Sequence, residues 1–176
     1  LALVAFSEDE AVEKLNSYLS ETKVKGLVTG RVKTENNSEI VFIFTGQGPQ
    51  WWAMGRQLLK DDPLFRKKIE KCDRLLSKYA SWSLVKELLR DEANSRIDDT
   101  AIAQPAIFAL QIALADLWKS RGVTPTAVIG HSVGEVAAAY CAGIYTLNDA
   151  IRIIYHRSRL QGKTRGSGRM VVVAIS

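Results

Sequence analysis

One serine stands in a sequence context typical of a catalytic nucleophile. Residues 130–135 read GHSVGE, which has the Gly-x-Ser-x-Gly spacing of a nucleophile elbow, a sharp turn that exposes a serine between a strand and a helix. A short apolar run at residues 127–129 precedes this segment, and the Ala-rich residues 136–141 follow it. The sequence therefore predicts that Ser132 is a nucleophile, although a serine that only caps the following helix has the same local sequence.

The residue types around Ser132 suit that chemistry. Gly130 and Gly134 lack a side chain, so that the strand and the helix can approach each other closely. The start of the helix presents free backbone N–H groups and a partial positive charge, which stabilise an oxyanion beside the serine. We expect the N–H of Val133, directly after the nucleophile, to be one donor.

A second oxyanion donor is expected from another loop. The Gly-Gln-Gly sequence at residues 46–48 follows a continuous apolar run at residues 40–44, which predicts a strand buried on both faces of a parallel sheet. Because the carboxyl ends of parallel strands meet at one edge of the sheet, this loop is a candidate neighbour of Ser132. Without the serine motif, the same loop would be interpreted as an ordinary glycine turn.

The remaining elements predict an α/β fold with a parallel sheet. Two sets of apolar residues have helical spacing, the first being Phe65, Ile69, Cys72 and Leu76 and the second Ile107, Leu110, Leu114, Leu117 and Trp118. Gly122 and Pro125 are expected to end the second helix. A third helix is expected after Thr146 or Asn148, and residues 170–175 predict another strand.

The first 40 residues are predicted to be a small unit apart from the rest. Residues 1–6 favour a strand, and residues 8–19 favour a helix that Ser7 caps. The polar residues 33–39 favour a linker. The sequence therefore places a domain boundary near residue 40.

Composition argues against several other classes of protein. With 176 residues, 47% of them hydrophobic and 24% charged, the chain has the make-up of a globular protein. No apolar run of the ~20 residues typical of a membrane-spanning helix stands out, and the N-terminus lacks signal-peptide features, so we expect a cytoplasmic location and no membrane partner. Cys72 and Cys141 form no CxxC pair, which predicts neither a metal site nor a disulfide framework.

Charge is unevenly distributed along the chain. The net charge is +5, but the basic residues form no aromatic-interleaved stripe, so we expect no nucleic-acid partner. Residues 152–169 contain six Lys and Arg residues and no Asp or Glu. This stretch is either a solvated face or a surface for an acidic partner, such as a phosphate-bearing thiol cofactor or an acidic carrier protein.

Four motifs occur in an order that resembles a known family. They read FTGQGPQW at residues 44–51, AQPA at residues 103–106, GHSVGE at residues 130–135 and HRS at residues 156–158, followed by GRM at residues 168–170. In this order they resemble the acyltransferase domains of modular type I polyketide synthases. They are also similar to the malonyl-CoA:acyl carrier protein transacylases of fatty acid synthesis.

The resemblance covers residues 41–176. It implies the N-terminal part of an acyltransferase domain, namely an α/β-hydrolase-like large subdomain that continues near residue 168 into a ferredoxin-like small subdomain. Residues 1–40 resemble the end of the linker that joins a ketosynthase to an acyltransferase in such multifunctional enzymes.

The resemblance also implies a reaction. Ser132 takes an acyl group, with malonyl as the first expectation, from coenzyme A and passes it to the phosphopantetheine thiol of an acyl carrier protein. The backbone N–H groups of Gln47 and Val133 form the oxyanion hole. Acyl-CoA is then a substrate, no tightly bound cofactor or metal is implied, and the partners are the carrier protein and the ketosynthase domain of the same polypeptide.

Three side chains are implied to bind the acyl group. Arg157 aligns with an arginine that pairs with the free carboxylate of a dicarboxylic acyl group, which suits its planar fork of donors. Gln104 and His131 align with positions that line the pocket. Without the family pattern, Arg157 would be interpreted as a surface residue and Gln104 as a residue at the start of a helix.

A general base is not evident in the sequence. A serine nucleophile needs a base, commonly a histidine, within hydrogen-bond reach. The chain has two histidines: His131, whose ring should point away from Ser132, and His156, for which we expect a packing or surface role. In the family the base lies further downstream, after the small subdomain. We therefore expect this chain by itself to be inactive.

One further expectation concerns this chain by itself. Without neighbouring strands, its sheet should expose a large apolar edge. Two alternative functions also stay open, a serine esterase of the α/β-hydrolase type and a non-catalytic remnant of an acyltransferase domain.

Overall fold

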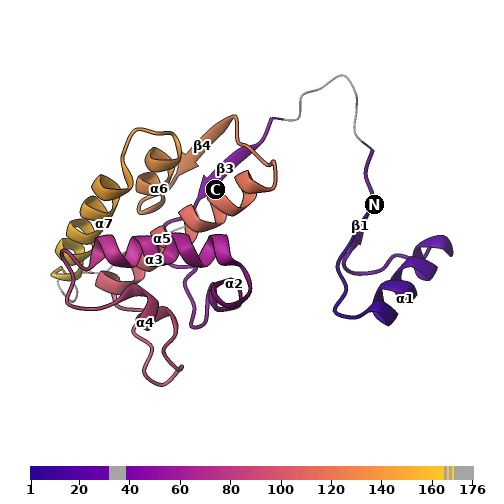
Figure 1. Ribbon diagram of the computed structural model, residues 1–176, viewed down its shortest axis with the longest axis horizontal. Helices are drawn as coiled ribbons and strands as arrows, with labels where there is room; N and C mark the ends of the chain where they lie inside the picture. Colours follow the sequence, from indigo (N-terminus) through magenta and orange to yellow (C-terminus); the bar gives the residue numbers. More distant parts are fainter. Residues whose placement is uncertain (32–38, 165, 167, 169–176) are drawn as a thin grey trace. The chain divides into compact units, whose positions relative to one another are not determined.

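The structure is a computed structural model that describes residues 1–31, 39–164, 166 and 168. The chain divides into two compact units, Leu1–Ser38 and Glu39–Ser176 (Figure 1). The strand predicted at residues 170–175 lies outside the described residues, as does the small subdomain expected beyond residue 168.

The first unit is a short helix beside two very short strands. The strands β1 (Ala2–Leu3) and β2 (Leu27–Val28) pair antiparallel, and α1 (Glu8–Leu19) lies between them in the sequence. Ser7 caps α1 as predicted, because its hydroxyl accepts the backbone N–H of Glu10 at 3.2 Å.

The strand predicted at residues 1–6 is wrong beyond Leu3. The backbone N–H of Val4 still donates to the carbonyl oxygen of Gly26 at 2.8 Å, but that of Phe6 donates to the Glu10 carboxylate at 2.7 Å, so by Phe6 the chain has left the strand for the start of α1. The side chain of Phe6 is 93% exposed, which also removes the packing that would favour a strand.

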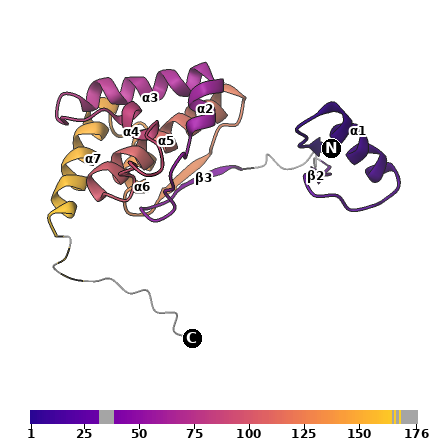
Figure 2. The ribbon, with the colours of Figure 1, turned by 90° about the horizontal axis from the view of Figure 1, so that it is seen from below.

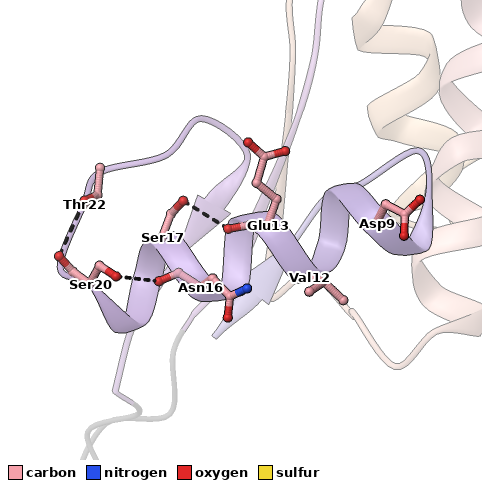
Figure 3. A pocket seen from close by; sticks show the side chains of 7 residues that line it. All are labelled: Asp9, Val12, Glu13, Asn16, Ser17, Ser20 and Thr22. Carbon is pink, nitrogen blue, oxygen red and sulfur yellow. Dashed lines mark hydrogen bonds between the residues drawn. The ribbon is translucent and has the colours of Figure 1, made fainter.

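α1 carries no buried residue. Figure 3 shows a shallow pocket along this helix, in which hydroxyl groups bond to carbonyl groups of the helix itself: Ser17 to Glu13 and Ser20 to Asn16, both at 3.0 Å. These two hydroxyl groups are therefore satisfied within the helix.

The second unit is built on two parallel strands, β3 (Val41–Phe44) and β4 (Ala127–Gly130). They pair in register from Val41 opposite Ala127 to Phe44 opposite Gly130. The carboxyl ends of both strands therefore lie side by side. The predicted α/β fold with a parallel sheet is confirmed.

Helices make up the rest of this unit. They are α2 (Arg56–Asp61), α3 (Pro63–Leu76), α4 (Leu84–Leu88), α5 (Thr100–Ser120), α6 (Gly134–Cys141) and α7 (Leu147–Gly162). α5 lies at the centre, in contact with α3, α6 and α7 (Figure 2). The apolar set predicted on α3 is confirmed, since its four residues are fully buried, and burial raises the pKa of the Cys72 thiol to about 12.

α5 combines an apolar sequence with a central position. Among the described residues it is the one helix long and apolar enough to cross a membrane. The expectation that the sequence contains no such apolar run is therefore wrong. In the fold, 72% of its most apolar stretch is buried. α5 ends at Ser120, and Gly122 follows with a φ of +83°, as its position in the sequence predicted.

The prediction that β3 is buried on both faces is wrong for the described residues. Phe44 is buried, but Ile43 is 71% exposed, and Ile129 on β4 is 57% exposed. Leu114 and Trp118, two members of the apolar set that predicted α5, are also exposed. Within the described part of the chain, Ile43 and Ile129 lie opposite each other and form an exposed apolar patch on one face of the sheet. The expected apolar edge stays a prediction.

A buried carboxylate fixes the loop between α4 and α5. The side chain of Glu87 is 2% exposed and pairs with both Arg90 and Arg96. Burial would raise the pKa of Glu87, but hydrogen bonds from Arg96 and Arg90 outweigh it and hold the pKa below its ordinary value of 4.5.

Glu87→Gln should therefore destabilise the fold in a pH-dependent manner. Because the pKa of Glu87 is lower in the folded state, its contribution is present above the unfolded pKa and is lost as pH falls through the folded pKa. We expect a loss of about 2 kcal/mol at pH 7, measured by denaturant titration, and a difference from wild type that shrinks at acid pH. A difference that stays constant down to acid pH would contradict this role.

Candidate active site

The ends of β3 and β4 bring two loops together. The carbonyl oxygen of Phe44 accepts the backbone N–H of His131 at 2.9 Å. Gly46 lies so close to the second loop that an added Cβ would be 3.3 Å from the Ser132 Cβ and 2.8 Å from Nδ1 of His131. The predicted proximity of the Gly-Gln-Gly loop to Ser132 is therefore present in the fold.

The turn at Ser132 has the geometry of a nucleophile elbow. Ser132 has a φ of +55°, a left-handed conformation that is costly for a residue with a Cβ. The glycines on either side allow the close approach: an added Cβ on Gly130 would lie 2.4 Å from the carbonyl oxygen of Gly134. One on Gly134 would lie 2.1 Å from the Phe44 carbonyl oxygen. No side chain fits at either position without moving the backbone.

Ser132 does not cap the helix that follows it. The N-cap of α6 is Val133, and no side chain makes a capping hydrogen bond there. The hydroxyl of Ser132 instead accepts a hydrogen bond from Nη2 of Arg157 at 2.9 Å. The alternative interpretation of Ser132 as a capping residue is therefore excluded.

Two backbone N–H groups of the elbow and the neighbouring loop have no acceptor among the described residues. In the hydrogen-bond pattern of residues 39–164, the N–H groups of Gln47 and Val133 donate to no protein acceptor. Val133 has a fully buried side chain, which anchors its position at the start of α6. The absence of acceptors for these two N–H groups among the described residues is consistent with an oxyanion hole, which stays a prediction.

Arg157 lies in the site rather than on the surface. It is on α7, which Thr146 caps by accepting the backbone N–H of Asp149. Nη2 of Arg157 contacts the nucleophile candidate, and Nη1 donates to Oε1 of Gln104 at 2.5 Å and to Oε1 of Gln161 at 3.0 Å. The guanidinium group thus connects α7 to α5 and to the elbow.

Gln104 is the buried centre of this network. It lies inside α5, which begins at Thr100, and only 2% of it is exposed. Its Nε2 donates to Oε1 of Gln47 at 3.2 Å and to Oε1 of Gln161 at 2.5 Å. The structure therefore brings Ser132, Arg157, Gln104 and the Gln47 side chain together, and adds Gln161, which the sequence analysis missed.

Neither histidine contacts the serine hydroxyl. His131 is exposed beside Gly46, and His156 is exposed and packs edge-on against Tyr155 and Tyr79 at ring distances of 5.2 and 5.9 Å. Among the hydrogen bonds of the described residues, none joins either ring to Ser132. A base for Ser132 is therefore not found in the described part of the chain.

Comparison with known proteins decides the family. A family model described as the acyl transferase domain matches residues 41–176. The chain belongs to this family. Among curated relatives, probable polyketide synthase 44 of Dictyostelium discoideum is 39% identical over 177 residues, 99% of this chain and 6% of that protein. Erythronolide synthase EryA2 of Saccharopolyspora erythraea is 38% identical over 174 residues, 99% of this chain and 5% of that protein.

Solved acyltransferase structures have the same fold. The acyltransferase domain from module 8 of the salinomycin polyketide synthase matches with a TM-score of 0.82 and 34% identity, over 92% of this chain and 38% of that chain. The malonyl-CoA:ACP transacylase of Synechocystis sp. PCC 6803 matches with a TM-score of 0.64 and 30% identity, over 73% and 41%. The chain thus spans about 40% of these solved chains and about 5% of the curated relatives. The resemblance to polyketide synthase acyltransferase domains is confirmed.

Two substitutions of the serine should separate backbone strain from chemistry. Ser132→Ala and Ser132→Gly both remove the hydroxyl, but only Gly adopts a φ of +55° without strain. We expect Ser132→Gly to be more stable than Ser132→Ala by about 0.5–1 kcal/mol, as measured by thermal unfolding of the acyltransferase domain. A more stable Ser132→Ala would mean that the turn is not strained in solution.

Proposed function

We propose that Ser132 takes an acyl group from coenzyme A and passes it to the phosphopantetheine thiol of an acyl carrier protein in polyketide biosynthesis. Malonyl is the acyl group that we favour. The observation that carries the proposal is the hydrogen bond from Arg157 Nη2 to Ser132 Oγ at 2.9 Å, inside a nucleophile elbow. It places a cation suited to a carboxylate next to the serine.

The two half-reactions follow from the site. In the first, Ser132 Oγ attacks the thioester carbonyl carbon, its proton goes to a base, and the C–S bond breaks to release coenzyme A as a thiol. In the second, the phosphopantetheine thiol attacks the acyl ester and the serine hydroxyl is regenerated. In both, the carbonyl oxygen becomes an oxyanion, and we assign its binding to the N–H groups of Gln47 and Val133. The proposal requires a base that the described residues do not supply.

The positive charge of Arg157 favours the binding of a dicarboxylic acyl group. In the part of the chain that the structure describes, its partners are the hydroxyl of Ser132 and the amide oxygens of Gln104 and Gln161, which are all neutral. An incoming carboxylate is a stronger acceptor than a hydroxyl, so it takes over the Nη2 hydrogen bond and releases Ser132 Oγ for attack. A neutral acyl group cannot make this exchange. A serine esterase would have no need of such a cation.

The partners follow from the same proposal. Acyl-CoA is the donor substrate, and the carrier protein with its phosphopantetheine is the acceptor, with no tightly bound cofactor, nucleic acid or membrane. Residues 1–40 belong to a linker to a ketosynthase domain of the same cytoplasmic polypeptide. The exposed basic side chains at the end of α7, namely Arg159 within the helix and Lys163 directly after it, offer an acidic carrier protein or a phosphate group a favourable surface.

The proposal is tested by acylation of the full-length protein with malonyl-CoA and acetyl-CoA, followed by intact mass and peptide mapping. We expect malonyl on Ser132 and no adduct in Ser132→Ala. Arg157→Ala should lower the malonylation rate by about 10- to 100-fold, equivalent to about 1.5–3 kcal/mol for a hydrogen bond to a charged group. It should not lower the acetylation rate, because the hydrogen bond that withholds Ser132 Oγ from a neutral acyl group is removed as well.

Arg74→Ala is the matched control, because Arg74 is an exposed arginine on α3. It should acylate like wild type. Hydrolysis of neutral esters that is unaffected by Arg157→Ala, without stable acylation from coenzyme A thioesters, would contradict the proposal and favour an esterase.

A further inference from the structure

Gln161 occupies a position that no motif in the sequence singles out. It lies in the last turn of α7, four residues after Arg157 and therefore on the same side of the helix. Its Oε1 accepts hydrogen bonds from Arg157 Nη1 at 3.0 Å and from Gln104 Nε2 at 2.5 Å. One amide oxygen thus contacts both Arg157 and Gln104 in the proposed acyl site.

Hydrogen bonds to two glutamines satisfy both hydrogens on one nitrogen of the guanidinium group. Nη1 of Arg157 carries two hydrogens, and the two acceptors beside it are Oε1 of Gln104 and Oε1 of Gln161. Because the guanidinium group is planar, fixing Nη1 also fixes the direction of Nη2. The Nη2 edge, the one that contacts Ser132, is left to receive a carboxylate.

Arg157, Gln104 and Gln161 form a closed ring of hydrogen bonds, each side chain bonded to the other two. Without Gln161, one hydrogen on Arg157 Nη1 and one on Gln104 Nε2 lose their acceptor. Gln104 is almost fully buried, so water cannot readily replace the acceptor that its Nε2 loses. Gln161 itself is exposed, so the freed hydrogen of Arg157 can turn to water instead. The arginine would then be free to leave the direction in which it faces Ser132.

We propose that Gln161 is a positioning residue that holds Arg157 toward Ser132 before the acyl group arrives, and so sets the preference for acyl groups with a free carboxylate. The inference rests on the proposed acyl transfer and deepens it. A neutral amide is suited to this task, because it orients the guanidinium group without neutralising the charge that attracts the substrate.

The test compares malonyl-CoA with acetyl-CoA as donors for the full-length protein and its Gln161→Ala variant. Because misorientation of a binding group weakens catalysis steeply, we expect kcat/KM for malonyl-CoA to fall about tenfold, mainly through KM, and kcat/KM for acetyl-CoA to stay nearly constant. Gln57→Ala, which truncates an exposed glutamine on α2, is the control and should match wild type. An equal loss for both donors, or no loss for either, overturns the inference.

Gln161→Glu adds a test that a purely structural role would not pass. It keeps an oxygen acceptor beside Arg157 but adds a negative charge that competes with the carboxylate of the substrate. We expect the malonyl preference to fall further than in Gln161→Ala, with thermal unfolding close to wild type. A malonyl preference like that of wild type in Gln161→Glu overturns the inference.

The outcomes separate this inference from the function on which it rests. If the wild-type protein acylates Ser132 with neither donor, the proposed function fails. If the wild type prefers malonyl-CoA and both Gln161 variants keep that preference in full, the function stands and the positioning role of Gln161 fails.

Discussion

The close approach of α6 to the end of β3 is the contact on which the site depends. The first residue of α6, Gly134, lies so near the Phe44 carbonyl oxygen that an added Cβ would be 2.1 Å away. A helix that begins this close to the sheet forces the chain to turn sharply after β4, and Ser132 takes up the turn with a φ of +55°. The exposure of the hydroxyl and the strain of the backbone are two results of the same contact.

Neutral groups hold the one cation of the network. Arg157 reaches from α7 to α5 and to the elbow, and in the described part of the chain its hydrogen-bond partners are two amide oxygens and one hydroxyl. A carboxylate partner from the protein would orient the guanidinium group equally well but would cancel its charge. The amide ring therefore combines a fixed direction with an uncompensated charge, which is what recognition of a free carboxylate requires.

Features that depend on neighbouring residues can be predicted from this sequence, whereas features that depend on distant residues cannot. The elbow and the buried face of α3 follow from local spacing, because glycine positions and helical periodicity leave their mark within a few residues. The exposure of one face of β3 cannot be predicted from local spacing, since an apolar run does not reveal whether a second layer covers Ile43. Gln161 was missed for a similar reason: its partner Gln104 is 57 residues away, and a lone glutamine near a helix end has no pattern of its own.

The most direct test of the central claim is a structure of the protein trapped with malonyl on Ser132, for instance in the absence of a carrier protein. The proposed function predicts that the free carboxylate lies within hydrogen-bond distance of Arg157 Nη2 and that the Arg157 contact with Ser132 Oγ is broken. It also predicts that the ester carbonyl oxygen faces the N–H groups of Gln47 and Val133. A malonyl carboxylate directed to solvent, with Arg157 still bonded to the serine oxygen, would contradict it.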